Sequence, residues 1–270
     1  MTSDHDAEPT KTTEELFLAS FEGGYDDELP WGAVCALRLG SEDDVFRLAA
    51  AYSRSEVPIH RARALDVLAQ LGAGKPFPER RHVRESVSIA IAHLGDENPL
   101  VASSAAWALA HLQGDPAISA LIGARKCADA QVRLAVAVGM AGSERSDAIR
   151  TLIELMEDDD DEVRNWATFG LGNAGAEQGP PVRFGTLDSA GIRDALRKRL
   201  TDSFRDVRDE AIWGLAFRRD PAALQLLLDR LNSKERIRGD ETTTAEILAL
   251  ASNAPVEALR TGLRNLLRNP

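Results

Sequence analysis

The chain has 270 residues, of which 44% are hydrophobic, 28% are charged and 5% are aromatic, and it carries a formal net charge of -11. This balance is typical of a soluble globular protein with a sizeable core, and it excludes a disordered chain and a membrane protein. Alanine and leucine dominate the apolar residues, which predicts helices rather than strands. The first 15 residues have neither a basic start nor an apolar core, so we expect no secretory signal and a cytoplasmic protein.

Acidic residues are concentrated in the first two thirds of the chain. Residues 1–182 carry 16 Lys and Arg against 30 Asp and Glu, whereas residues 183–270 carry 16 against 13. A protein that binds nucleic acid without sequence preference needs a basic surface to displace counterions. We therefore expect no nucleic-acid partner, although the last third offers a local basic patch.

The two ends of the chain differ from its middle. Residues 1–11 are polar and acidic, which predicts a disordered tail. Thr12 and Glu15 have the spacing of a capping box, so a first helix is expected to begin there and to run to Phe21. Residues 12–232 are expected to form one repeat domain, which residues 233–270 close with atypical capping helices.

A ten-residue phrase recurs along the chain. Its clear copies read VASSAAWALA, VRLAVAVGMA, VRNWATFGLG and VRDEAIWGLA, beginning at Val101, Val132, Val163 and Val207, and fainter copies begin at Trp31 and His60. The three central starts are 31 residues apart. A second apolar run at helical spacing lies between successive copies, so each unit is predicted to be two antiparallel helices.

The phrase resembles the HEAT repeat, in the variety found in bacterial HEAT-like proteins and phycobilisome lyases. An acidic turn, Val-Arg, alanines and Leu-Gly carry the resemblance, which covers roughly residues 30–231. It implies an all-α fold, an α-solenoid of antiparallel helix pairs stacked in a right-handed superhelix. It does not identify a function, because the same fold serves scaffolds, lyases and nucleic-acid enzymes.

Two positions of the phrase have a structural explanation. Three residues before the valine stand Asn98, Asp129 and Asp160, which can cap the first turn of the helix. The residue after the valine is arginine at three copies: Arg133, Arg164 and Arg208. HEAT-like repeats stack a ladder of Asp and Arg at this position, and we interpret these arginines as structural.

No catalytic or metal-binding motif is present. The five histidines are scattered, and there is no His-Glu dipeptide of the kind with which HEAT-repeat hydroxylases hold iron. The acidic run from Glu157 to Glu162 lacks the glycine and the spacing of a calcium loop, so it is interpreted as a solvated turn. Cys35 and Cys127 are expected to be free and buried. We predict no metal and no cofactor, and we lean against an enzyme.

Aromatic residues recur at an unexpected position of the phrase. Counting the valine as zero, a helical wheel points positions +2 and +6 away from the core, towards the groove lined by this helix. Position +6 holds Trp107, Val138, Phe169 and Trp213, flanked by Asn165 and Asp209 at +2 and by His111 and Asn173 at +10. The rings either line a binding groove or are tucked between units. Trp166, at +3, is expected near the core.

These features favour a non-enzymatic scaffold or interaction module that binds a protein or peptide, of basic character, in a concave groove. The candidate binding residues are Trp107, His111, Asn165, Phe169, Asn173, Asp209 and Trp213. A phycobilin-lyase-like protein, or another accessory subunit of a HEAT-repeat enzyme, is the alternative. Two insertions, at residues 72–81 and 176–191, are either binding loops or tolerated surface loops.

Overall fold

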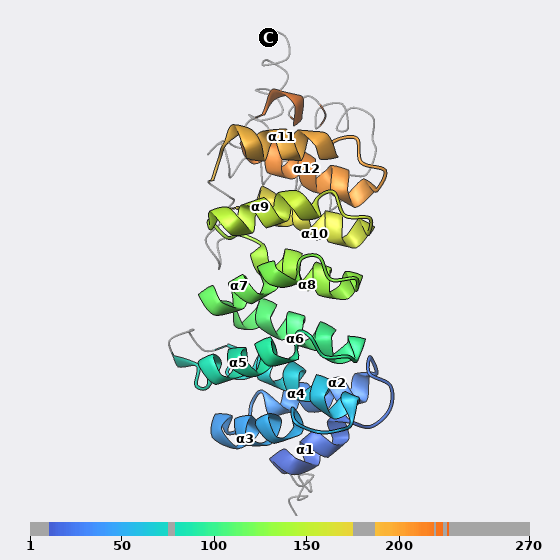
Figure 1. Cartoon of the computed structure of the whole chain (residues 1–270), viewed down its shortest axis with the longest axis vertical. Helices are drawn as coiled ribbons and strands as arrows, with labels where there is room; N and C mark the ends of the chain where they lie inside the picture. The colour runs from blue at the N-terminus through green and yellow to red at the C-terminus, as the bar shows by residue number, and fades with distance from the viewer. Residues whose placement is uncertain (1–10, 75–78, 175–186, 219, 224–225, 227–270) are drawn as a thin grey trace, which may run out of the picture. The chain divides into compact units, whose positions relative to one another are not determined.

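The computed structural model describes residues 11–74, 79–174, 187–218, 220–223 and 226. These residues form twelve α-helices and no strand (Figure 1), which confirms the all-α class for the described part of the chain. The chain divides into two compact units, residues 1–124 and 125–270, and each is described by itself. The expected tail at residues 1–10 and the expected capping helices at 233–270 lie outside the described residues.

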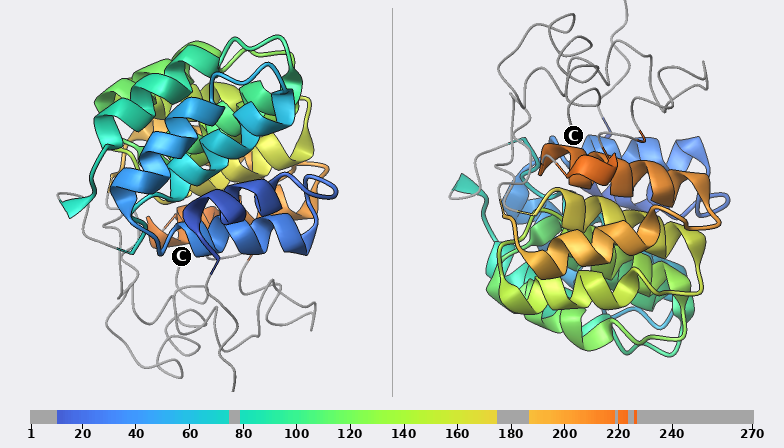
Figure 2. Two further views of the ribbon diagram at one scale, coloured as in Figure 1. Left: turned by 90° about the horizontal axis from the view of Figure 1, so that it is seen from below. Right: turned by 90° about the horizontal axis from the view of Figure 1, so that it is seen from above.

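Unit 1 contains seven helices. They are α1 (Thr13–Ser20), α2 (Glu28–Leu37), α3 (Glu42–Tyr52), α4 (Pro58–Gln70), α5 (Val83–His93), α6 (Pro99–Leu112) and α7 (Asp115–Ala124). Helices α2, α4 and α6 pack against one another in that order, and α3, α5 and α7 pack beside them (Figures 1 and 2). The buried cluster at the N-terminal end of this unit centres on Phe17, Val34, Val45 and Leu68.

Unit 2 contains the remaining five described helices. They are α8 (Ala130–Met140), α9 (Ser146–Leu155), α10 (Asp161–Gly172), α11 (Ala190–Arg199) and α12 (Arg205–Phe217). Helix α10 packs between α8 and α12, while α9 and α11 cover the other side of this row. The predicted helix pairs are therefore confirmed within each unit.

The helices begin where the sequence predicts. The side chains of Asn98, Asp129 and Asp160 each accept a hydrogen bond from a backbone N–H of the following first turn. At the first helix, Thr12 and Glu15 form both hydrogen bonds of the capping box. Each cap satisfies amide groups that have no partner within the helix, so the start of each of these helices is fixed in part by its local sequence.

The arginine ladder is present in both units. In unit 2 the Arg133 guanidinium donates to both carboxylate oxygens of Asp158, at 2.8 Å each, and to the carbonyls of Cys127 and Ala128. Arg164 repeats this arrangement with Asp202, and in unit 1 Arg61 does so with Asp96. The hydrogen bond from Arg61 lowers the pKa of Asp96. Arg61, Arg133 and Arg164 each tie their own turn to the turn of the next copy, which confirms the structural interpretation for Arg133 and Arg164. Arg208 donates to the carbonyls of Asp202 and Ser203 in its own turn.

Glycines let α10 and α12 approach closely. A Cβ atom added to Gly214 would lie 2.8 Å from the Cα of Gly172 and 3.1 Å from the Leu196 side chain. Real Cβ atoms do not come that close to backbone, so these positions accept only glycine without a shift of the helices. Gly214 stands at position +7 of its copy of the phrase, and the other clear copies have Ala108, Gly139 and Gly170 there. This small-residue position is therefore a packing position.

The two cysteines are free, as expected, but the expectation that they are buried was wrong. Cys35 is exposed and Cys127 is half-buried. Cys35 lies on α2, which packs against α1 and α4, and the described helices of unit 1 leave its side chain exposed. Cys127 lies in the turn before α8 and uses its carbonyl in the arginine ladder. Among the described residues, no helix is long and apolar enough to cross a membrane.

Candidate partner-binding surfaces

The residues at position +6 are only partly covered. Trp107 on α6 belongs to unit 1, whereas Val138, Phe169 and Trp213 lie on α8, α10 and α12 of unit 2. Phe169 is 37% exposed and the other three side chains are half-buried. The Trp107 ring lies 6.1 Å from the exposed His111 ring, whose Nδ1 is 2.8 Å from the Trp107 carbonyl. The side chains at position +6 therefore stay partly accessible within each unit rather than being fully tucked between helices.

An exposed pair of aromatic rings stands out on α10. Trp166 and Phe169 are each 37% exposed, and their rings meet edge to face with centroids 5.4 Å apart. On the same helix Val163, Ala167 and Leu171 are completely buried. The expected core position of Trp166 was wrong, because +3 lies at the boundary of the buried side of α10 and the described helices cover the ring only in part. Its spacing of three residues from Phe169 was the available signal.

The two residues at position +2 are not on the surface. Asn165 is 6% exposed and Asp209 is 1% exposed, so the expectation that +2 lines a groove was wrong. On α10 this position lies on the same side as Gly172, seven residues further on, and that side faces α12. The Asn165 Oδ1 atom has no hydrogen-bond partner among the described residues, and Asp209 pairs with Arg205.

Most residues of the acidic turn before α10 have structural roles. Asp158 belongs to the arginine ladder, Asp160 caps α10, and Asp161 forms an ion pair with Arg164. Asp159 and Glu162 are exposed beside the N-terminus of the helix. In the described part of the chain, no group of three His, Cys, Asp or Glu residues could hold a metal ion. The exposed carboxylates of Asp159 and Glu162 leave negative charge at the surface that a partner can contact.

In unit 1 the loop between α1 and α2 covers part of α4 and α6. The Tyr25 hydroxyl lies 2.8 Å from both Asp66 Oδ2 and Ser104 Oγ. Arg63 donates to Asp66 and to the carbonyls of Ser20 and Tyr25, and its guanidinium lies over the Tyr25 ring at 4.5 Å. Burial raises the pKa of Asp66 to about 6, and burial with the Asp66 charge raises the pKa of Tyr25.

The cluster of Tyr25, Arg63, Asp66 and Ser104 explains why the row of accessible side chains at position +6 does not continue beyond α6 to α4. Asp66 occupies position +6 of the phrase that begins at His60, the position of the aromatic rings in later copies. It is only 7% exposed because the Tyr25 loop lies over it. The sequence signal for this contact was weak, since a single tyrosine between Gly24 and Asp26 does not indicate where its hydroxyl binds. Among the +6 residues of these two copies in unit 1, it is therefore Trp107 that stays accessible.

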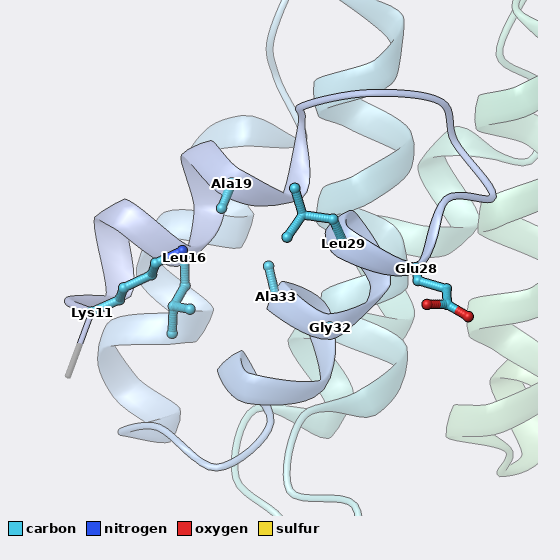
Figure 3. Close-up of a pocket in the computed structure, with 7 residues that line it drawn as sticks. All are labelled: Lys11, Leu16, Ala19, Glu28, Leu29, Gly32 and Ala33. Atoms are coloured by element: carbon cyan, nitrogen blue, oxygen red, sulfur yellow. The ribbon is translucent and has the colours of Figure 1, made fainter. Parts of the chain in front are cut away.

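An apolar groove opens at the N-terminal end of unit 1 (Figure 3). It has a volume of about 520 Å³ and lies between α1 and α2. Leu16, Ala19, Leu29 and Ala33 point into it, with Lys11 and Glu28 at its two ends. Leu29 is 64% exposed. The sequence pattern did not indicate this groove, because it arises where two helices leave a side uncovered.

The arginines of α11 in unit 2 are largely paired with acidic side chains. Asp220 accepts from Arg193 and from Arg197, and both arginines also pair with a second aspartate. Arg199 pairs with Glu157 and Asp202. These arginines hold turns and helices together, and their charges are offset locally. These side chains do not form a continuous basic face over the described residues.

Only the ends of the two insertions are described. Residues 75–78 and 175–186 lie outside the described residues. At the end of the first insertion, Arg81 donates its backbone N–H to Glu42 and its guanidinium to Asp43 of α3. His82 stacks on Phe46, with centroids 4.2 Å apart. This basic end is therefore attached to α3.

Comparison with known proteins identifies the repeats. A family model described as HEAT repeats matches residues 45–141 and 184–251, which is more than half of the chain. Protein YibA of Escherichia coli (strain K12) is 34% identical over 100 residues. That match covers 37% of this chain and 32% of YibA, so the aligned part spans about a third of the relative.

Solved structures agree with this fold. The X-ray structure of E. coli YibA aligns with a TM-score of 0.68 and 23% identity, covering 96% of this chain and 93% of that one. A chain from the structure of Kap95p bound to RanGDP aligns with a TM-score of 0.60 and 14% identity, covering 95% and 36%. An archaeal HEAT-like repeats protein from Thermococcus onnurineus NA1 aligns with a TM-score of 0.51 and 15% identity, covering 95% and 98%. At these identities the likeness is one of fold.

Proposed function

Because this chain belongs to the HEAT repeat family, in which stacked helix pairs present an extended surface, we propose that it is a non-enzymatic interaction module. Its partner is a protein or peptide. The central contact is the aromatic pair of Trp166 and Phe169 on α10. Trp107 and His111 in unit 1, with Asn173 and Trp213 in unit 2, belong to the proposed binding surface of their own units. Asn165 and Asp209 do not, because they are buried.

The exposure of the pair is the observation that supports this proposal. Two large rings each keep 37% of their surface accessible, whereas the aliphatic residues of the same helix are completely buried. Exposed aromatic surface is unfavourable in water, and aromatic side chains supply much of the binding energy at protein interfaces. A pair already packed edge to face also loses little side-chain freedom when a partner binds.

The charge beside the pair favours a basic partner. Asp159 and Glu162 are exposed in the turn and first residues of the same helix, and the whole chain carries a net charge of -11. Such a surface attracts a cationic partner over roughly 10 Å at moderate salt. The fold-level likeness to Kap95p, which binds the protein RanGDP, agrees with a protein-binding function.

A capture experiment with matched variants tests the proposal. Wild-type protein, Trp166→Ala/Phe169→Ala and Ile91→Ala are immobilised and exposed to lysate of the native cell, and retained proteins are quantified by mass spectrometry. Ile91 is the control because it is 38% exposed but lies on α5 of unit 1. We expect a partner that the wild type and Ile91→Ala retain and the double variant loses by at least about tenfold, as is typical of aromatic anchors.

The stability of the variants separates binding from packing. Each ring is 37% exposed and therefore mostly covered, so the double variant is expected to lose some stability, and capture is compared at a temperature where both proteins are folded. A large drop in the melting temperature with unchanged capture would identify the rings as core and contradict the proposal. Asp159→Asn/Glu162→Gln should weaken capture mainly at low salt, and an effect that does not depend on salt would contradict the electrostatic part.

A further inference from the structure

One side of helix α2 is left open by the described helices of unit 1. Helix α2 packs against α1 and α4, whereas α4 has α2 on one side and α6 on the other. Leu29, Gly32 and Ala36 are three and four residues apart, which places them along one stripe of the helix, next to Ala33, which is 7% exposed. Leu29 is 64% exposed, and a Cβ added to Gly32 would meet nothing within 4 Å.

Small residues on a helix are covered by a neighbouring helix elsewhere in the protein. In unit 2, Gly172 and Gly214 allow α10 and α12 to approach until a Cβ at Gly214 would lie 2.8 Å from backbone. Small residues on α2 offer a similar close approach, but the space in front of Gly32 is open. With Leu16 and Ala19 of α1, the stripe lines a groove of about 520 Å³ that can receive the side of another helix (Figure 3).

The charges at the ends of the groove indicate what fills it. Lys11 lies at one end and Glu28 at the other (Figure 3). In a two-fold symmetric contact the same surface meets itself, so residues away from the axis pair reciprocally with different residues of the partner, whereas residues at the axis meet their own copies. A groove that is positive at one end and negative at the other is complementary to an antiparallel copy of itself. Lys11 of each copy would then face Glu28 of the other.

We propose that the groove between α1 and α2 is the interface of a symmetric homodimer, and that its occupant is the same helix pair of a second copy. The leucines supply the apolar centre of the contact, Gly32 lets the two α2 helices approach, and the two pairs of Lys11 and Glu28 set the antiparallel direction. This inference is independent of the partner-binding surface on α10, which belongs to unit 2.

Molar mass in solution tests the dimer. The full chain, with a monomer mass of 29.3 kDa, is followed by light scattering and sedimentation over a concentration series. We expect twice that mass for the wild type and the monomer mass for Leu29→Glu at the same concentrations. Leu39→Glu is the matched control, because Leu39 is 81% exposed and does not line the groove, and it should remain dimeric. Since both leucines are exposed, neither substitution should unfold the chain, and any lower melting temperature of Leu29→Glu should disappear at concentrations low enough for the wild type to be monomeric.

Reversed charges test the direction of the contact. Lys11→Glu should raise the dissociation constant about tenfold or more, because the carboxylate introduced on each copy would then face the carboxylate of Glu28 on the other. Lys11→Glu/Glu28→Lys should restore it, because the two charges are exchanged. An unchanged dissociation constant in the single variant, or no recovery in the double variant, would overturn the antiparallel arrangement.

Mixed-isotope cross-linking excludes an occupant from the same chain. Unlabelled and ¹⁵N-labelled proteins are mixed and treated with a carbodiimide, which joins a lysine to a nearby carboxylate without a spacer. The proposal requires Lys11–Glu28 peptides with one labelled and one unlabelled half. A wild type that stays monomeric throughout the series, a dimeric Leu29→Glu variant, or cross-links only within one copy would overturn the proposed homodimer.

Discussion

At the scale of single residues, the carboxyl group of Asp66 has a strongly raised pKa with a clear physical cause. Burial raises its pKa from 3.8 to about 6, although Tyr25, Arg63 and Ser104 all favour the charged form. Only 7% of the residue is exposed, so solvent screens it little. A group whose pKa is higher in the folded than in the unfolded state stabilises the fold at low pH, and this stabilisation is lost as pH rises through the folded value.

We predict a pH-dependent stability difference between the wild type and Asp66→Asn. As pH rises from about 4 to about 6.5, the wild type should lose up to about 3 kcal/mol relative to the variant, which cannot ionise at this position. Urea unfolding at several pH values measures this difference. The other carboxyl groups are common to both proteins, so their contributions cancel. A difference that stays constant with pH would show that Asp66 has an ordinary pKa.

At the scale of helices, packing between neighbouring elements limits side-chain size more than helix propensity does. Gly214 lies in the middle of α12, where alanine would normally stabilise the helix by roughly 0.5–1 kcal/mol. The extra methyl group, however, would press on Gly172 of α10 and on the Leu196 side chain. Contact between two helix backbones cannot be relieved by turning a side chain, so the helices must separate.

We therefore predict opposite effects for two glycine substitutions. Gly214→Ala should lower the free energy of unfolding by about 1–3 kcal/mol through overpacking. Gly123→Ala is the control, because Gly123 lies in α7 with nothing within 4 Å of the added methyl group. It should be neutral or stabilising by less than about 1 kcal/mol. Chemical unfolding of both variants measures the contrast, and equal effects would show that α10 and α12 tolerate a wider spacing.

At the scale of the whole molecule, the division into two units coincides with a gap in the repeated pattern. The copy beginning at Val101 has Ala102 where other copies have arginine, and the following copy has Cys127 where the ladder has aspartate. Both members of one Arg–Asp pair are thus missing from the sequence at this junction, and the units separate at residues 124 and 125. In repeat proteins stability is the sum of unit and neighbour terms, so the missing Arg–Asp pair favours separate unfolding of the two units.

We predict that the two units unfold at different denaturant concentrations. The four tryptophans report on them separately, because Trp31 and Trp107 lie in unit 1, whereas Trp166 and Trp213 lie in unit 2. Trp31→Phe/Trp107→Phe leaves fluorescence from unit 2 only, and Trp166→Phe/Trp213→Phe leaves fluorescence from unit 1 only. Two different midpoints are expected. Coincident midpoints in both variants, and in circular dichroism, would instead show one cooperative transition.

Local and periodic features could be predicted from the sequence by itself. The caps at Asn98, Asp129 and Asp160, the capping box at Thr12, and the ladder arginines depend on residues in the same turn or one repeat away. Their partners are therefore at fixed positions in the pattern. The repeat and its apolar periodicity likewise determined the all-α helix pairs.

Which side of each helix is covered was decided only by the tertiary structure. A helical wheel gives the angle of a residue, but not whether a neighbouring element occupies that angle. Asn165 is buried because α12 packs on its side of α10, whereas the described helices of unit 2 cover the side of α10 that carries Trp166 only in part. Asp66 is covered by the Tyr25 loop, which is distant in sequence, and the groove beside Leu29 is open because the row of helices in unit 1 begins at α2.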